Sequence, residues 1–401
     1  MRVVLALGVV AVLTSACQLS RPPGTVFTFA GSTSDRGPGS ATDAFMTPGA
    51  VAVSGSSFYV ADTPHDVIRR VDADGSQVVV AGTGVIGNLG DGGPATAATL
   101  ASPRGLAVDG SGNLVIADSK RIRVVAVTTG TFDGQAMTAG DIYTIAGGGS
   151  PGQPGATATS VSFVDPTSLA VDSAGNVLVG SGLNGTLTSI WVVPATTGTF
   201  YGQAMAAGDI YPLASFSSTV SGCMGVSAAG RVSGIAVDGS GNVIFAANGC
   251  VWVMPANSGS FFGQTMVAGN VFSIGGSLPL PPGNGLAVDQ AGDVVEAEGY
   301  GARVIEISRV TGHVATVAGT GISGKSGDGG PAGSAQLGAP LGVAVDGVGN
   351  LVLADSRADR VRVVAASTGT FYGQAMTAGD IDTRWPVAVQ TVTAGRPPRP
   401  R

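Results

Sequence analysis

The sequence is poor in the side chains that most enzymes use for catalysis. Among 401 residues there are 2 histidines, 3 cysteines, 5% aromatic residues and 11% charged residues. Catalysis by a nucleophile and a base usually needs a histidine beside a serine or cysteine, and a histidine-rich zinc site needs several imidazoles. His65 and His313 are too few for such a zinc site. The scarcity of Glu, Lys and Arg also argues against a mostly helical fold.

Basic side chains are scarce as well. The net charge is −6 at pH 7, and the only basic cluster is "RPPRPR" at Arg396 to Arg401. Recognition of nucleic acid needs a basic face or stripe, so we expect no nucleic acid partner. We expect residues 386–401 to form a Pro- and Arg-rich disordered tail, because the final stretch offers no apolar side chains to pack.

The chain has one long apolar run, at its beginning. "MRVVLALGVVAVLTSAC" has one arginine, an apolar stretch and then small residues, which predicts a signal peptide over residues 1–16. No later segment offers about 18 uninterrupted apolar residues, so we expect no membrane helix in the mature protein. Cys17 after "LTSA" is similar to a bacterial lipobox, although Thr14 stands where Leu is usual.

These features predict an exported protein whose Cys17 thiol carries a lipid anchor on the outer side of the cell membrane. Ordinary secretion with an unmodified Cys17 is the alternative.

What the sequence has in abundance is glycine, with 65 residues, and a phrase that recurs. "PRGLAVDGSGNLVIAD" at Pro103 has five relatives, and each copy reads as two β-strands around an Asp-capped turn. Two further apolar runs follow in each unit, so a unit contains four antiparallel strands. Six such units predict an all-β, six-bladed β-propeller. The alanines that mark the six units are Ala52, Ala107, Ala170, Ala236, Ala287 and Ala344.

The ends of the repeat array predict how the ring closes. "TVFTFAG" at Thr25 to Gly31 has the form of a fourth strand without the other three, and the last unit breaks off after Asp380. We expect the N-terminal strand to complete the last blade of a propeller spanning residues 25–385, so that no sheet edge stays open. "VQTVTAG" at Val389 to Gly395 is a rival closing strand.

Two long segments resemble bacterial NHL-repeat propellers. They are "AGTGVIGNLGDGGPATAATLASPRGLAVDGSGNLVIAD" at residues 81–118 and "AGTGISGKSGDGGPAGSAQLGAPLGVAVDGVGNLVLADSRADRVRVV" at residues 318–364. The resemblance extends over about residues 25–380, and units three, four and five lack the Asp that ends the second strand. It implies the propeller fold, whereas function varies among such propellers from ligand binding and sensing to catalysis.

An insert of the form "GTFYGQAMTAGD" separates the third and fourth strands in units two, three, four and six. Since all turns of one class emerge on one face of a propeller, we expect four matching hairpins on one face. Their Phe and Met residues either pack locally and stabilise each hairpin or form an adaptable contact surface. We favour local packing, because one partner would not contact four copies alike. The "GDGGPA" segments at Gly90 and Gly327 lie between blades and lack the Lys-Ser/Thr of a phosphate loop, so we interpret them as turns.

The acidic side chains divide into a repeated group and two exceptions. Asp109, Asp172, Asp238, Asp289 and Asp346 recur at the first turn of their units, which predicts turn capping. Asp62, Asp118 and Asp355 are expected to pair with Arg69, Arg121 and Arg360. Glu296 and Glu298 replace residues that are apolar or small elsewhere, so they are candidate functional outliers.

The remaining candidate residues are the histidines and two cysteines. His65 and His313 lie in different classes of turn, so the fold separates them onto opposite faces. Cys223 and Cys250 belong to loops of one face, and we expect a disulfide within unit four, with two free thiols as the alternative.

The function best supported by the sequence is a binding or scaffold module for a protein or glycan of the cell envelope. We expect a monomer with no cofactor and no catalytic residue set. A metal-dependent lyase or lactonase that works at the central channel is the alternative, and the metal content of the protein discriminates between the two.

Overall fold

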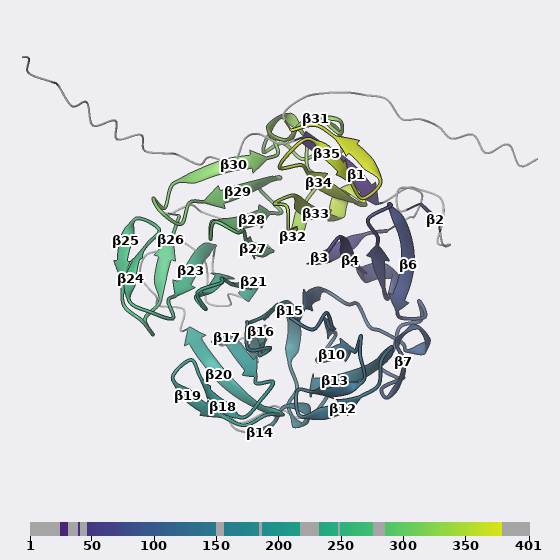
Figure 1. The fold of residues 1–401 in the computed structure, drawn as a ribbon, viewed down its shortest axis with the longest axis vertical. Coiled ribbons are helices and arrows are strands. Elements are labelled where there is room, and N and C mark those ends of the chain that lie inside the picture. Colours follow the sequence, from purple (N-terminus) through teal and green to yellow (C-terminus); the bar gives the residue numbers. More distant parts are fainter. Residues whose placement is uncertain are drawn as a thin grey trace, which may run out of the picture.

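The structure is a computed structural model, and it describes residues 25–30, 39–40, 46–149, 156–183, 187–216, 232–247, 249–275 and 285–378. Its main strands form six antiparallel sheets around a central axis, which confirms the predicted all-β, six-bladed propeller (Figure 1). The described residues contain short 3-10 turns and no α-helix. None of them belongs to a helix that is long and apolar enough to cross a membrane. Residues 1–16, Cys17, Cys223 and residues 386–401 lie outside the described ranges.

Each blade begins with its innermost strand and runs outward (Figure 1). Blade one consists of β3 (Pro48–Ser54), β4 (Ser57–Asp62), β5 (Val67–Val71) and β6 (Ser76–Ala81). Blade two consists of β8 (Gly105–Val108), β9 (Leu114–Asp118), β10 (Arg121–Val125) and β13 (Asp141–Gly147). Blade three consists of β15 (Val164–Val171), β16 (Val177–Leu183), β17 (Leu187–Val193) and β20 (Asp209–Phe216).

The second half of the ring repeats this order. Blade four consists of β21 (Val232–Val237), β22 (Val243–Ala247), β23 (Cys250–Met254) and β26 (Phe272–Ile274). Blade five consists of β27 (Leu286–Val288), β28 (Val294–Glu298), β29 (Arg303–Ile307) and β30 (Val314–Ala318). Blade six contributes β32 (Pro340–Val345), β33 (Leu351–Asp355) and β34 (Arg360–Val364).

The fourth strand of blade six comes from the other end of the chain. β1 (Thr25–Ala30) pairs antiparallel with β34, with Phe27 opposite Val363, and lies beside blade six in Figure 1. This confirms that the N-terminal strand closes the ring. The rival segment at residues 389–395 lies outside the described residues.

Four two-residue strands extend the outer edges of the blades. They are β2 (Gly39–Ser40), β7 (Gly93–Pro94), β14 (Ala156–Thr157) and β31 (Gly330–Pro331), on blades one, two, three and six. β7 and β31 belong to the "GDGGPA" segments, so these segments pair with the fourth strand of the following blade. An edge strand that is paired in this way offers fewer free backbone groups to other chains.

The core lies between the blades. Each of the six clusters of buried apolar side chains draws on two neighbouring blades, for example Phe58 of blade one and Val363 of blade six. Burial of apolar area between adjacent sheets therefore holds the ring together, at about 25 cal/mol for each Å² removed from water.

The inserts form β-hairpins at the rim, as expected (Figure 1). Their methionines are at most 2% exposed and belong to the core clusters between neighbouring blades, so they are buried, as favoured, but pack beyond their own hairpins: Met137, Met205, Met266 and Met376. The strand pairs are β11 (Gly130–Phe132) with β12 (Gln135–Met137), β18 (Gly198–Phe200) with β19 (Gln203–Met205), β24 (Gly259–Phe261) with β25 (Gln264–Met266), and β35 (Gly369–Phe371) with β36 (Gln374–Met376).

Two of the hairpins also contact the next blade. The Phe262 and Gly263 amides donate to the carbonyls of Arg309 and Val310 in blade five, at 2.5 and 3.1 Å. The Tyr372 ring packs edge-on against Phe58 of blade one, with 4.9 Å between the centroids. Blades one and five have short turns instead of hairpins, so the preceding hairpin fills the space beside them.

Candidate functional site

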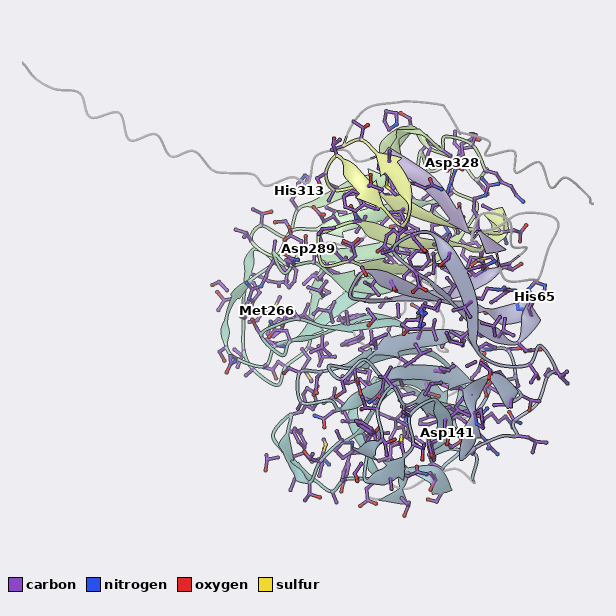
Figure 2. The ribbon with its side chains drawn as sticks, turned by 45° about the vertical axis from the view of Figure 1, so that its right-hand side comes forward. His65, Asp141, Met266, Asp289, His313 and Asp328 are labelled. Carbon is purple, nitrogen blue, oxygen red and sulfur yellow. The ribbon has the colours of Figure 1, made fainter. Side chains whose placement is uncertain are left out.

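The strand order gives the disc two different faces. The hairpin face carries the first turns, between the first and second strands of each blade, together with the hairpins. The loop face, on the opposite side, carries the second turns, between the second and third strands, together with the connections between blades. His65 follows β4 on the loop face, and His313 precedes β30 on the hairpin face. The two histidines lie far apart in Figure 2, so they cannot act in one catalytic set.

His65 has a structural partner on its own blade. Its Nδ1 lies 2.6 Å from Oδ1 of Asp62, whose other oxygen lies 3.0 Å from Nε of Arg69. The side chain of Asp62 is fully buried and that of His65 is 11% exposed. The carboxylate of Asp62 thus joins the turn after β4 to β5.

The repeated aspartates at the first turns cap those turns. Asp109 Oδ1 accepts from the amides of Ser111 and Asn113 at 2.8 Å, and Oδ2 accepts from the Asn113 side chain at the same distance. The Asn113 oxygen in turn accepts from the Val127 amide, which ties the first turn to the end of β10. The same bonds from two backbone amides recur at Asp172, Asp238, Asp289 and Asp346 and confirm the prediction.

Buried arginines organise the loop-face side of blades one, two and six. Arg123 is fully buried and binds Asp118 at 3.2 Å and Asp91 of the preceding "GDGGPA" segment at 2.6 Å. Arg362 is also fully buried and binds Asp355 at 3.2 Å and Asp328 of the other "GDGGPA" segment at 2.8 Å. Removing one partner of such a pair leaves a buried charge without compensation, so these pairs are structural.

The predicted partners were right in one blade and wrong in two. Arg69 pairs with Asp62 as expected. Asp118 and Asp355 pair with Arg123 and Arg362, two residues beyond Arg121 and Arg360. The predicted arginines contact the "GDGGPA" aspartates instead: Arg121 lies 3.9 Å from Asp91, and Arg360 lies 3.0 Å from Asp328.

Blades three and four use tryptophan where blades one, two and six use arginine. Trp191 and Trp252 hold the third-strand position of Arg123, since Trp191 pairs with Val179 as Arg123 pairs with Ile116. In blade four, Ala247 replaces the buried aspartate, and its carbonyl accepts from the Trp252 indole at 3.1 Å. The missing aspartates of these units are therefore matched by missing arginines.

Glu296 and Glu298 lie on β28 and are each 1% exposed. Glu298 occupies the place of Asp118 and accepts from Arg303, whose pKa is raised chiefly by this hydrogen bond. Glu296 lies opposite Ile305, which stands where blades one, two and six carry the buried arginine. The ion pair to Arg303 gives Glu298 a structural role at the start of the turn after β28.

Directly after Glu298, the loop face carries an aromatic side chain that sequence analysis overlooked. Tyr300 is 71% exposed, and the guanidinium carbon of Arg357 from blade six lies 5.9 Å from its ring centroid. Gly299 and Gly301 flank the tyrosine, and Arg357 is exposed. The signal for this pair was in the sequence: Tyr300 is an aromatic in the turn between second and third strands, where the turns of the other described blades carry none.

Among the described acids of the hairpin face, Asp133 has the most strongly raised pKa. It occupies the tip of the blade-two hairpin, where blades three and six carry Tyr201 and Tyr372. Those tyrosines donate to turn aspartates, Tyr372 to Asp346 at 3.1 Å. Burial, and secondarily the charge of Asp109, raise the pKa of Asp133 to about 7.

The described residues contain no group of three or more His, Cys, Asp or Glu side chains arranged to hold a metal ion. Cys250 begins β23 and is 4% exposed. Its predicted partner Cys223 lies outside the described residues, so the disulfide stays a prediction.

The chain is similar in fold to solved propellers, whereas no family model and no curated protein matches it. An auxiliary nutrient binding protein from Bacteroides thetaiotaomicron has a TM-score of 0.55 at 13% identity, covering 85% of this chain and 76% of its own. One from Bacteroides ovatus has 0.52 at 15%, covering 86% and 77%. A gluconolactonase from Xanthomonas campestris has 0.51 at 12%, covering 87% and 92%. At these identities the likeness establishes a shared β-propeller fold.

Proposed function

We propose that this protein is an exported NHL-type propeller that serves as a binding or scaffold module for a glycan or protein of the cell envelope. The observation that carries the proposal is the exposed Tyr300–Arg357 pair on a loop face whose other described arginines are ion-paired. Tyrosine and arginine are among the side chains that are enriched where proteins bind partners. Two neighbours in fold are described as nutrient binding proteins, and a binding role is compatible with that fold.

The buried charges favour binding over catalysis. The aspartates of the first turns bond backbone amides, and the acids at the ends of the second strands of blades one, two, five and six bond arginines. A carboxylate committed in this way stabilises the fold and is poorly placed to exchange protons with a substrate. The rigid disc then acts as a preformed platform, which lowers the entropy lost on binding.

The position of β1 gives the proposed tether a direction. As a fourth strand, β1 runs from the hairpin face toward the loop face, so Thr25 lies at the hairpin face. Seven residues lie between it and Cys17, so an extended chain spans at most about 28 Å from Cys17 to Thr25. A lipid on Cys17 would hold the hairpin face toward the membrane and leave the loop face open to the envelope.

The test measures binding and metal content on the same protein. The full chain, purified without chelator, is incubated with separated polysaccharide and protein fractions of the envelope, and saturable binding is measured by sedimentation. We expect saturable binding to one fraction and substoichiometric metal. Stoichiometric calcium or zinc together with hydrolysis of a lactone would establish the metal-dependent enzyme instead, and failure to bind either fraction would reject the module.

A further inference from the structure

We propose that Tyr300 and Arg357 form a subsite for an acidic saccharide, that is, a sugar residue that carries a carboxylate. This inference rests on the proposed function and names its ligand class. On the described loop face, Tyr300 is the single exposed aromatic ring that lies beside an arginine without a carboxylate partner, and that arginine is Arg357.

Arg357 differs from the other arginines of the loop face. Within the described ranges, each of the others lies within 4 Å of a carboxylate, whereas Arg357 has no such neighbour. Its guanidinium is exposed and held beside the Tyr300 ring from the neighbouring blade. The ion pairs of the other exposed or half-buried arginines are Arg104–Asp165, Arg121–Asp91, Arg303–Glu298 and Arg360–Asp328.

The pair offers two contacts that one uronate residue can satisfy together. A guanidinium binds a carboxylate through two parallel hydrogen bonds, which gives strength and direction. An aromatic ring presents a flat apolar surface that fits the C–H face of a pyranose, and its hydroxyl can donate to a sugar oxygen. Tyr300 is flanked by Gly299 and Gly301, so no neighbouring side chain along its own loop covers the ring.

The cation–π contact prepares the site before the ligand arrives. Arg357 and Tyr300 come from different blades and hold each other at 5.9 Å, so fewer side-chain rotations are lost on binding. A point anion such as phosphate would use Arg357 alone and gain nothing from the ring. A carboxylated sugar uses both side chains, which is why the geometry points to that class.

The charge distribution of the disc directs an anionic polymer to the same face. The hairpin face carries two of the described basic side chains, Arg70 and Arg309, and the loop face carries the other ten. The acids of the hairpin face therefore repel a polyanion and favour approach to the loop face. These acids are Asp72, Asp74, Asp109, Asp133, Asp141, Asp172, Asp209, Asp238, Asp289, Asp293 and Asp346.

The experiment titrates the full chain with trimers of galacturonate, glucuronate and mannuronate and with their neutral methyl esters, followed by calorimetry or ligand-detected NMR. We expect at least one acid trimer to bind, and its ester to bind about tenfold more weakly. Tyr300→Ala and Arg357→Gln should each weaken binding about tenfold, whereas Tyr300→Phe should retain most of it. Arg309→Gln is the matched control, since Arg309 makes the corresponding contact with Phe261 on the hairpin face.

Several results would overturn the subsite. They are no binding of any acid trimer, equal binding of acid and ester, loss of binding in Arg309→Gln as large as in Tyr300→Ala, or competition by inorganic phosphate with no effect of Tyr300→Ala. Envelope protein bound in place of the trimers would reject the saccharide and leave the binding module standing. Circular dichroism and a thermal melt show that each variant is folded.

Discussion

Replacing Asp133 by Asn should raise the free energy of unfolding of the propeller, by an amount that increases with pH. The side chain stands at the tip of the blade-two hairpin, in a turn whose central residues Asp133 and Gly134 have φ values of 49° and 74°. Asn tolerates positive φ as well as Asp does, so the substitution leaves the turn intact and removes only the charge.

The magnitude follows from the pKa of about 7 that burial imposes on Asp133, against an ordinary value of 3.8. Because the pKa is higher in the folded state than in the unfolded state, the protonated carboxyl is the form that folding favours. The contribution of this group to wild-type stability is therefore fully present below about pH 4, and it is lost as the pH rises to about 7. At about 1.4 kcal/mol for each pKa unit the limit is about 4 kcal/mol, and partial solvation reduces the expected loss to about 1–3 kcal/mol.

Urea unfolding of wild type and Asp133→Asn at pH 4, 5, 6, 7 and 8 measures this effect. The free energy of unfolding of the variant should exceed that of wild type by an amount that rises between pH 4 and 7 and then levels off. Asp74→Asn is the control, because Asp74 is fully exposed and the Ser76 hydrogen bonds lower its pKa. A difference between variant and wild type that stays constant from pH 5 to 8 would refute the raised pKa of Asp133.

Three further predictions concern contacts within and between blades. Gly373→Ala should lower Tm by several °C more than Gly202→Ala, because both glycines have positive φ but only a Cβ at Gly373 would collide with the Asp74 carbonyl. Asp355→Ala and Arg362→Trp should each cost about 3–5 kcal/mol in urea unfolding, and the double variant clearly less than their sum, since blade four folds with that combination. Dithiothreitol should lower the Tm of wild type and leave Cys250→Ser unaffected, since a disulfide stabilises by about 2–4 kcal/mol.

The architecture was predictable from the sequence because its signals are local and repeated. The turn after each first strand needs a capping acid and residues that accept positive φ. The sequence has these residue types at Asp109 and its counterparts. Closure by β1 was predictable because the chain has a fourth strand without a blade at Thr25–Ala30 and a last unit without a fourth strand. The two pair in the structure.

The partners of the buried acids were harder to predict because burial decides between two nearby arginines. Arg121 and Arg123 extend from the same side of β10, and Arg121 is closer to Asp118 in sequence and in strand register. Arg123 is fully buried, whereas Arg121 is 29% exposed and can stay hydrated. The carboxylate binds the arginine that would otherwise be buried without a counter-charge. Burial of that unpaired guanidinium would destabilise the fold more than leaving the hydrated arginine unpaired.

The irregularity of blade five was visible, but its exposed part was overlooked. Glu296 and Glu298 attracted attention as acids at apolar positions, and both proved to be buried. A single sequence does not reveal that the side chain two positions later points into solvent, since exposure depends on how the turn after β28 meets blade six. The cue was a tyrosine between two glycines.

The blades fill the third-strand position of Arg123 in three ways. Blades six, one and two join an aspartate, an arginine and, in two cases, a loop aspartate, whereas blades three and four use tryptophan. Blade five has Ile305 there, and its acid Glu298 binds Arg303, which is 37% exposed. The acids of blades two and six also accept from the preceding loops, through the amides of Ala101 and Gly338. The turn after β28 presents Tyr300 to solvent beside Arg357, in a blade whose third strand has Ile305 in place of a buried arginine.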